Sequence, residues 1–201
     1  MHIREFAATF LLLAVTAAPG TAQDTASPCW VRGDRADLEL RASPYDSTAA
    51  SLEGGTVKVC YSRPRKLGRP IMGRLVSYGE PWRLGANEAT AVHVSARATI
   101  AGVAVEPGWY SLMAIPGERE WGIVVNARGQ RWGIPIDPEV RSADIGTGVV
   151  PVTEEVGSVE LFTLDLVPTG PSAADLVMAW DRTRVRIPVV LTELSTPGER
   201  R

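Results

Sequence analysis

The chain has 201 residues, of which 45% are hydrophobic and 22% charged, the balance of one ordinary globular domain and not of a disordered segment. The formal net charge of −2 excludes the basic footprint that binding to nucleic acid or to an anionic membrane surface requires. The 19 glycines and 15 prolines favour many turns and short strands over long helices.

The first 22 residues have the pattern of a secretory signal peptide. His2 and Arg4 give a weakly positive start, and an apolar run over Phe6–Ala18 follows. The small residues and the helix breaker in Pro19–Ala22 fit cleavage after Ala22. The alternative, a membrane anchor, is disfavoured because the apolar run is too short to span a bilayer comfortably. We therefore expect export, to the periplasm or out of the cell, with no membrane span in the mature chain.

After the signal peptide the sequence predicts one domain between two polar ends. Residues 23–34 have the composition of a flexible spacer, and residues 195–201 that of a polar tail. Within residues 35–194 no window of helix length shows a convincing period of 3.6 residues. The expected strands are Arg35–Arg41, Thr56–Tyr61, Thr90–Ser95, the hairpin Ala98–Val105, Trp109–Ile115, Trp121–Asn126, Val159–Val167, Asp175–Trp180 and Arg184–Leu191.

Short strands with turn signals between them predict an all-β fold, an antiparallel β-sandwich or jelly roll in a single domain. Two irregular connections interrupt the strands. Ser62–Arg74 is basic and is broken by prolines and glycines, and long connections of this kind often carry function. Ile134–Pro151 is rich in proline, glycine and aspartate, and is expected to be a surface excursion.

The two cysteines, Cys29 and Cys60, form an even pair in a chain that is expected to be exported. Oxidising compartments favour disulfides, so the sequence predicts one bridge between the start of the mature chain and the strand around Cys60. The alternative is two separate thiols.

The stretch Trp82–Thr90 gathers an aromatic ring, a cation, an amide and a carboxylate between two apolar segments. A buried Glu88 can act as general acid or base if burial raises its pKa. Arg83 can hold an anionic group in a bidentate fork, and Asn87 can donate a hydrogen bond to a developing oxyanion. The alternative is structural: a buried Arg83–Glu88 ion pair, with Asn87 capping a turn, would order a long loop without chemistry.

A ligand-binding set can be assembled around the same stretch. Trp82 and Trp132 can wall a pocket and stack on a sugar or an aromatic ring, and Arg63 can hold an anion as Arg83 can. The expected ligand-binding residues are Arg63, Trp82, Arg83, Asn87, His93 and Trp132. Trp109, Trp121 and Trp180 lie in expected strands and fit the core better than a ligand platform.

Metal and cofactor chemistry have little support. After removal of the leader only His93 remains as a histidine, and a zinc site needs several nitrogen or sulfur ligands. The acidic residues over Asp137–Asp144 lack the ligand rhythm of a calcium loop. His93 is also the only base for a serine triad, and no nucleophile elbow and no phosphate-binding glycine loop is present. We expect no metal and no cofactor.

The run Trp82–Thr90 resembles the hallmark of a bacterial family, DUF2911, a domain of unknown function. The likeness also includes Ser62–Pro64, Gly68–Arg69, Gly73, Leu75–Gly79, Gly102, Pro107–Leu112, Ile115–Pro116, Trp121, Asn126, Trp180, Val185 and Ile187–Val189, and it covers roughly 57–191. The resemblance implies an exported, β-rich bacterial protein and carries no activity. Two departures are the loose segment Ile134–Pro151 and Cys60, which stands where an ordinary strand residue is expected.

Three functions remain open at this point. The leading hypothesis is a non-enzymatic module that binds a small polar or carbohydrate-like ligand in a pocket of Arg, Asn and Glu side chains. The second is a hydrolase, lyase or isomerase that uses Glu88 as acid or base, with Arg83 and Asn87 as electrophilic helpers. The third is a structural protein of the cell envelope. The sequence identifies neither the ligand nor the oligomeric state.

Overall fold

The structure is a computed structural model that describes residues 28–192. The expected signal peptide over 1–22, the start of the expected spacer up to residue 27, and the expected polar tail over 195–201 lie outside the described residues. The elements within this range are η1 (Arg35–Leu40), β1 (Tyr45–Leu52), β2 (Gly55–Ser62), β3 (Thr90–Val94), β4 (Ala98–Ile100), β5 (Val103–Val105), β6 (Gly108–Pro116), β7 (Glu120–Asn126), α1 (Pro138–Arg141), β8 (Asp144–Gly170) and β9 (Ala173–Leu191).

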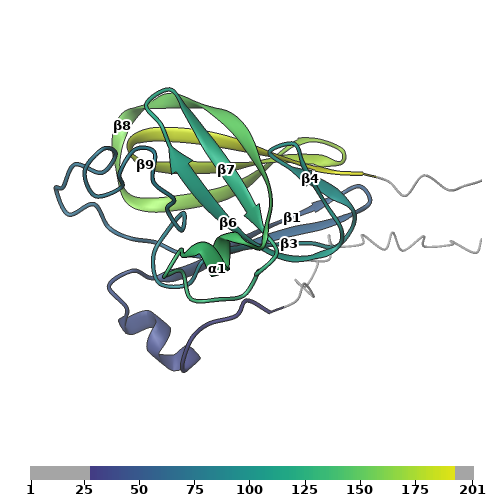
Figure 1. Ribbon diagram of the computed structural model, residues 1–201, viewed down its shortest axis with the longest axis horizontal. Helices are drawn as coiled ribbons and strands as arrows, with labels where there is room; N and C mark the ends of the chain where they lie inside the picture. Colours follow the sequence, from purple (N-terminus) through teal and green to yellow (C-terminus); the bar gives the residue numbers. More distant parts are fainter. Residues whose placement is uncertain (1–27, 193–201) are drawn as a thin grey trace, which may run out of the picture.

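The nine strands of the described range form one antiparallel sheet in the order β1-β2-β3-β6-β7-β8-β9-β4-β5. The strand β8 has two neighbours in succession: its part over 144–151 pairs with β7, and its part over 152–170 pairs with β9. The sheet therefore folds over on itself without closing, and Figure 1 shows β8 and β9 above β1 and β3. The expected antiparallel, β-rich fold is confirmed, while the pairing does not by itself establish a sandwich or a jelly roll.

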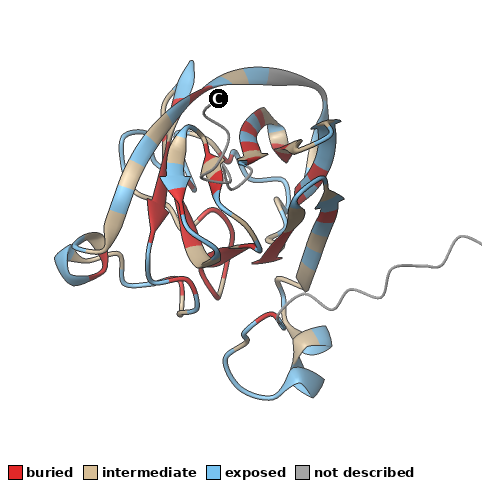
Figure 2. Cartoon of the chain, turned by 90° about the vertical axis from the view of Figure 1, so that its right-hand side faces the viewer, coloured by how far each residue is buried: buried red, intermediate tan, exposed pale blue. Residues whose placement is uncertain are grey.

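The core lies between the two halves of this folded sheet. Val57, Val59 and Tyr61, which the alternation in β2 places on one face, are each exposed by 2% or less. From the other half, Phe162 and Leu164 of β8 join the same apolar cluster and are fully buried. Because successive side chains of a strand point to opposite faces, β2 supplies every second residue to this core. Figure 2 shows the buried residues gathered on the strands.

The predicted strand over Arg35–Arg41 is wrong, because Arg35–Leu40 forms the 3-10 helix η1. The side chain of Asp34 accepts a hydrogen bond from the backbone N–H of Ala36, which satisfies a free donor at the first turn. No residue of η1 is buried, and Leu40 is 84% exposed. The alternation of apolar and charged residues there has no neighbouring strand to pair with, so local capping decides the backbone.

The prediction that Ile134–Pro151 is only a surface excursion is also wrong. The segment contains α1 and the first part of β8, which pairs with β7. Its glycines have a packing role: a Cβ at Gly148 would lie 1.8 Å from the carbonyl oxygen of Ala101, and one at Gly146 would lie 3.1 Å from Val103. Glycine in a strand often marks such a close approach, so a composition typical of loops here belongs to a strand.

Candidate functional site

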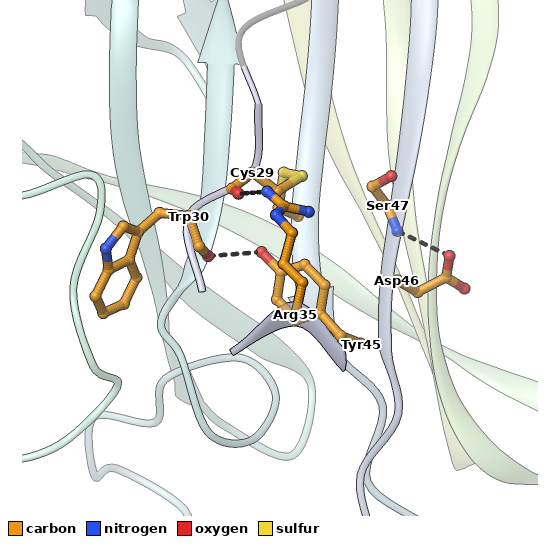
Figure 3. The surroundings of a disulfide bond; sticks show 7 residues. Cys29, Trp30, Arg35, Tyr45, Asp46 and Ser47 are labelled. Carbon is orange, nitrogen blue, oxygen red and sulfur yellow. Dashed lines mark hydrogen bonds between the residues drawn. A yellow bond between two sulfur atoms is a disulfide. The ribbon is translucent and has the colours of Figure 1, made fainter. Parts of the chain in front are cut away.

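The chain segment before the first strand, residues 28–43, crosses one end of the domain and is called the N-terminal arm below. A disulfide between Cys29 and Cys60 ties it to β2, with 5.9 Å between the two Cα atoms. The predicted bridge is confirmed, and it hints at an oxidising compartment. Figure 3 shows Cys29 with the guanidinium of Arg35 beside it, where Arg35 donates a hydrogen bond to the Cys29 carbonyl.

The Glu88 carboxylate lies beneath the N-terminal arm and is only 2% exposed. Arg41 Nη1 contacts both carboxylate oxygens at 2.9 Å, and the backbone N–H of Arg32 donates to Oε1 at 2.9 Å. The Ser62 hydroxyl donates to Oε2 over a longer 3.4 Å. The ion pair of Glu88 is therefore made with Arg41 from the arm and not with Arg83. With both oxygens engaged and buried, Glu88 is closed to a substrate in this conformation.

The backbone around Glu88 is held by a loop that comes from after β7. The Gly133 N–H donates to the Asn87 carbonyl at 2.9 Å, and the Ala89 N–H donates to the Arg131 carbonyl at 3.1 Å. Asn87 has a positive φ of 57°, a conformation that asparagine tolerates better than most residues. Its side chain donates weakly to the Ser43 carbonyl, at 3.4 Å. This turn directs the side chain after Asn87 toward the arm.

Arg83 lies apart from Glu88, although it is close in sequence. Its side chain packs along Gly133, where an added Cβ would come within 2.3 Å of Arg83 Cδ. Its Nε is buried and has no hydrogen-bond partner within the described range. Burial lowers the pKa of the Arg83 guanidinium from its usual range. Within the described residues, neither Arg83 nor the Asn87 side chain makes a hydrogen bond to the Glu88 carboxylate, whereas Arg83 and the Asn87 carbonyl both lie against Gly133.

Trp82 and Arg63 contact residues other than Glu88. The Trp82 ring stacks on Trp180 at 5.9 Å between centroids and meets Phe162 edge-on at 5.6 Å, inside the aromatic part of the core. Arg63 donates to the Phe162 carbonyl at 3.1 Å and pairs with Asp46 at 3.0 Å, which joins β8 to β1. Both side chains therefore connect the two halves of the sheet.

His93 belongs to a row of cross-strand neighbours on the outer face of the sheet. It pairs in register with Lys58 on β2 and with Trp109 on β6, and its ring centroid lies 5.0 Å from that of Trp109. Burial, and then the positive charge of Lys58, lower the pKa of His93 below its usual 6.5. The imidazole is therefore neutral near pH 7 and packs as a polar ring against the indole.

This lowered pKa gives a testable pH dependence. The unfolded chain takes up the proton at a higher pH than the folded chain does, so the contribution of His93 to stability is complete above the unfolded pKa and is lost as the pH falls through the folded one. Between about pH 7.5 and about pH 5.5 the melting temperature of the parent protein should fall further than that of a His93→Gln variant. Thermal unfolding across this range checks it, and parallel profiles would contradict it.

Two open recesses of about 540 Å³ each flank the N-terminal arm. The polar recess lies on one side and is lined by Arg35, Tyr45, Asp46 and Lys58. The indole recess lies on the other side and is lined by Trp30, Trp109, Gln130 and Arg35. In Figure 3 the Trp30 ring points away from Asp46 and Ser47, so the arm separates the two recesses.

The arm is further fixed by contacts of its own near these recesses. Burial, and then the charge of Glu88, raise the pKa of the Tyr45 hydroxyl well above its usual range. The hydroxyl therefore stays protonated and donates to the Trp30 carbonyl at 3.0 Å. Arg32 places its guanidinium over the Trp132 ring, 5.1 Å from the ring centroid. Trp132, one of the expected ligand-binding residues, thus contacts the arm.

Sequence reasoning missed several residues at these places, and it expected Trp109 in the core; the missed residues include Trp30, Arg32, Arg35, Arg41 and Gln130. None belongs to the Trp82–Thr90 run, on which the expected site was built. The expected disulfide was the one usable signal, because a bridge from Cys29 to Cys60 necessarily brings Trp30 and its neighbours onto β2. The position of the arm was nevertheless missed, because the strand predicted over Arg35–Arg41 placed those side chains in a sheet.

Within residues 28–192, no group of three or more His, Cys, Asp or Glu side chains is arranged to hold a metal ion. In the same part of the chain, no helix has the length and apolar character needed to cross a bilayer.

Comparison with known proteins gives a family and no function. Residues 43–189 match the model of a family described as a protein of unknown function, DUF2911. No curated protein and no solved structure matches the chain. The matched range contains Cys60 and Glu88, whereas Cys29, Arg32 and Arg41 of the N-terminal arm precede it.

Proposed function

This chain belongs to the DUF2911 family, and we propose that it is an exported binding module that takes a small polar, carbohydrate-like ligand in the indole recess. Export is supported by the disulfide, which oxidising compartments favour, and by the signal-like start of the sequence. The observation that carries the ligand class is the lining of the recess, which combines two indole rings with a guanidinium and an amide.

The lining suits a ring that carries hydroxyl groups. Indole faces offer apolar area to the C–H faces of such a ring, and the amide of Gln130 and the guanidinium of Arg35 offer hydrogen bonds at its edge. The volume of about 540 Å³ lies within the range of sites for small molecules. Gly129 helps to shape the recess, because a Cβ there would lie 2.5 Å from the Trp109 carbonyl, so the loop of Gln130 can lie directly on β6.

In this proposal the residues that the sequence predicted for the site mainly support the side chains that line the recess. His93 packs against Trp109 and orients its ring, while Trp132 and Glu88 hold the arm that carries Trp30. Arg83 and Asn87 shape the loop around residue 133. The polar recess is the weaker candidate, because Asp46 is paired with Arg63 and the Tyr45 hydroxyl is engaged with the arm.

Removing the Trp30 ring tests the proposal. Trp30 is 37% exposed, so Trp30→Ala should leave the fold intact and weaken binding about tenfold or more, by loss of one aromatic wall. The measurement is isothermal titration against a panel of neutral mono- and disaccharides, with the disulfide intact.

Tyr78→Ala supplies the matched control, since Tyr78 is a comparably exposed aromatic residue, 42% exposed, that does not line the recess. It should bind as the parent does. The proposal is wrong if no saccharide binds the parent protein, or if the two variants lose affinity equally.

A further inference from the structure

We infer that Glu88, Ser62 and Trp132 form a binding site for a guanidinium group, and that arginines of the N-terminal arm occupy it as a tethered ligand. None of these residues lines the indole recess, so a guanidinium can bind here whether or not that recess takes a saccharide. It would accept an arginine side chain of another molecule when the arm does not fill it.

The Glu88 carboxylate has contacts from two parts of the chain, the N-terminal arm and the body of the domain. The guanidinium of Arg41 and the backbone N–H of Arg32, both from the arm, lie at 2.9 Å from the oxygens of Glu88. From the body of the domain, Ser62 contributes the long hydrogen bond of 3.4 Å. A buried carboxylate that loses its cation is strongly unfavourable. Without the arm, Glu88 would therefore lack the guanidinium and the backbone N–H that now contact both of its oxygens.

The residue whose backbone pairs with Glu88 carries an aromatic ring. Glu88 and Trp132 are paired as an isolated antiparallel bridge, so their backbones run side by side. The indole already carries a guanidinium, that of Arg32, at 5.1 Å. A carboxylate that pairs with Arg41 and an indole that carries the guanidinium of Arg32 both suit the planar, weakly hydrated guanidinium better than the compact ammonium of lysine. The ligand class is therefore an arginine side chain, or a peptide that carries one.

The N-terminal arm lies on the surface of the domain, as a bound peptide ligand would. None of the residues of η1 is buried, so the arm contributes little apolar surface to the core. It projects from the body of the domain in Figures 1 and 2. Its hold on the domain includes the disulfide at Cys29, the ion pair of Arg41 and the stacking of Arg32. The family match covers residues 43–189, so it includes Glu88 and does not include Arg32 or Arg41.

Chemical rescue tests the site directly. Arg41→Ala removes the guanidinium and should lower the melting temperature by about 10 °C. Ethylguanidinium at millimolar concentration should then raise the melting temperature of this variant by several degrees, because the free cation can enter the space that the side chain leaves. The parent protein, whose site is filled, should show no rise.

Two controls separate recognition from a general solvent effect. Ethylurea, which has nearly the same shape without the charge, should not rescue Arg41→Ala. The double variant Arg41→Ala/Glu88→Gln should not respond to ethylguanidinium. Equal responses of parent and variant, or no response of a folded Arg41→Ala variant, would overturn the inference. If Arg41→Ala does not stay folded, the refolding yield replaces the melting temperature: a higher yield with ethylguanidinium than with ethylurea supports the site, and equal yields overturn it.

Discussion

An Arg41→Ala variant is expected to have a free energy of unfolding about 3–5 kcal/mol below that of the parent protein. The reason is the environment of Glu88, whose side chain is 2% exposed and would be left buried without the cation that it pairs with. Chemical denaturation of both proteins, with the disulfide intact, measures the difference. A loss this large is expected of a buried ion pair that is broken on one side, and not of an ordinary surface contact.

Substitution of the other partner of this ion pair, Glu88, should destabilise the protein less. Arg41 is 18% exposed, so in a Glu88→Gln variant its guanidinium can still reach water, and the loss should be smaller than that of Arg41→Ala. Arg97→Ala is the matched surface control, because its pair with Glu106 is 54% and 68% exposed and should contribute less than about 1 kcal/mol. Equal small losses for Arg41→Ala and Arg97→Ala would show that the Arg41–Glu88 contact does not hold the arm.

Removal of the disulfide should have the second largest effect. Cys29 and Cys60 are 31 residues apart in sequence, and closing a loop of that length lowers the entropy of the unfolded chain by an amount equivalent to about 3.5 kcal/mol. A Cys29→Ala/Cys60→Ala variant should therefore unfold at a lower denaturant concentration. Its saccharide affinity should also fall, because the arm supplies Trp30 and Arg35 to the indole recess.

The parent protein treated with a dithiol reductant is the control for this variant. Reduction breaks the same covalent link without any substitution, so the two samples should unfold at closely similar denaturant concentrations. Unchanged stability on both routes would mean that the arm is held without the covalent link. Lower stability of the alanine variant alone would assign the loss to packing around Cys60, which is 1% exposed.

Much of the fold could be predicted because it rests on period-two alternation. The inward residues of β2 are those that the sequence places on one face, and Trp121 and Trp180 lie in the core as expected. Trp109, which was expected with them, is only half-buried and lines the indole recess. The disulfide was accessible because two cysteines allow only one intramolecular pairing. The family was accessible because the run Trp82–Thr90 is specific, and residues 43–189 match its model.

The partner of Glu88 could not be predicted for a physical reason. Arg83 is five residues away and Arg41 is 47 residues away, and an ion pair between distant segments leaves no periodic pattern in the sequence. The turn at Asn87, which has a positive φ, directs the Glu88 side chain toward the N-terminal arm, whereas the Arg83 side chain packs on Gly133. In the same way, the glycines of β8 resemble loop residues until the strand that they contact is known.

Hydrogen exchange at the Arg32 amide tests most directly whether the N-terminal arm covers Glu88, since this N–H donates to the buried carboxylate at 2.9 Å. In the oxidised parent protein the amide should exchange far more slowly than in an unstructured peptide, and an Arg41→Ala substitution should speed its exchange. An Arg32 amide that exchanges at the peptide rate in the oxidised parent would contradict the docked arm.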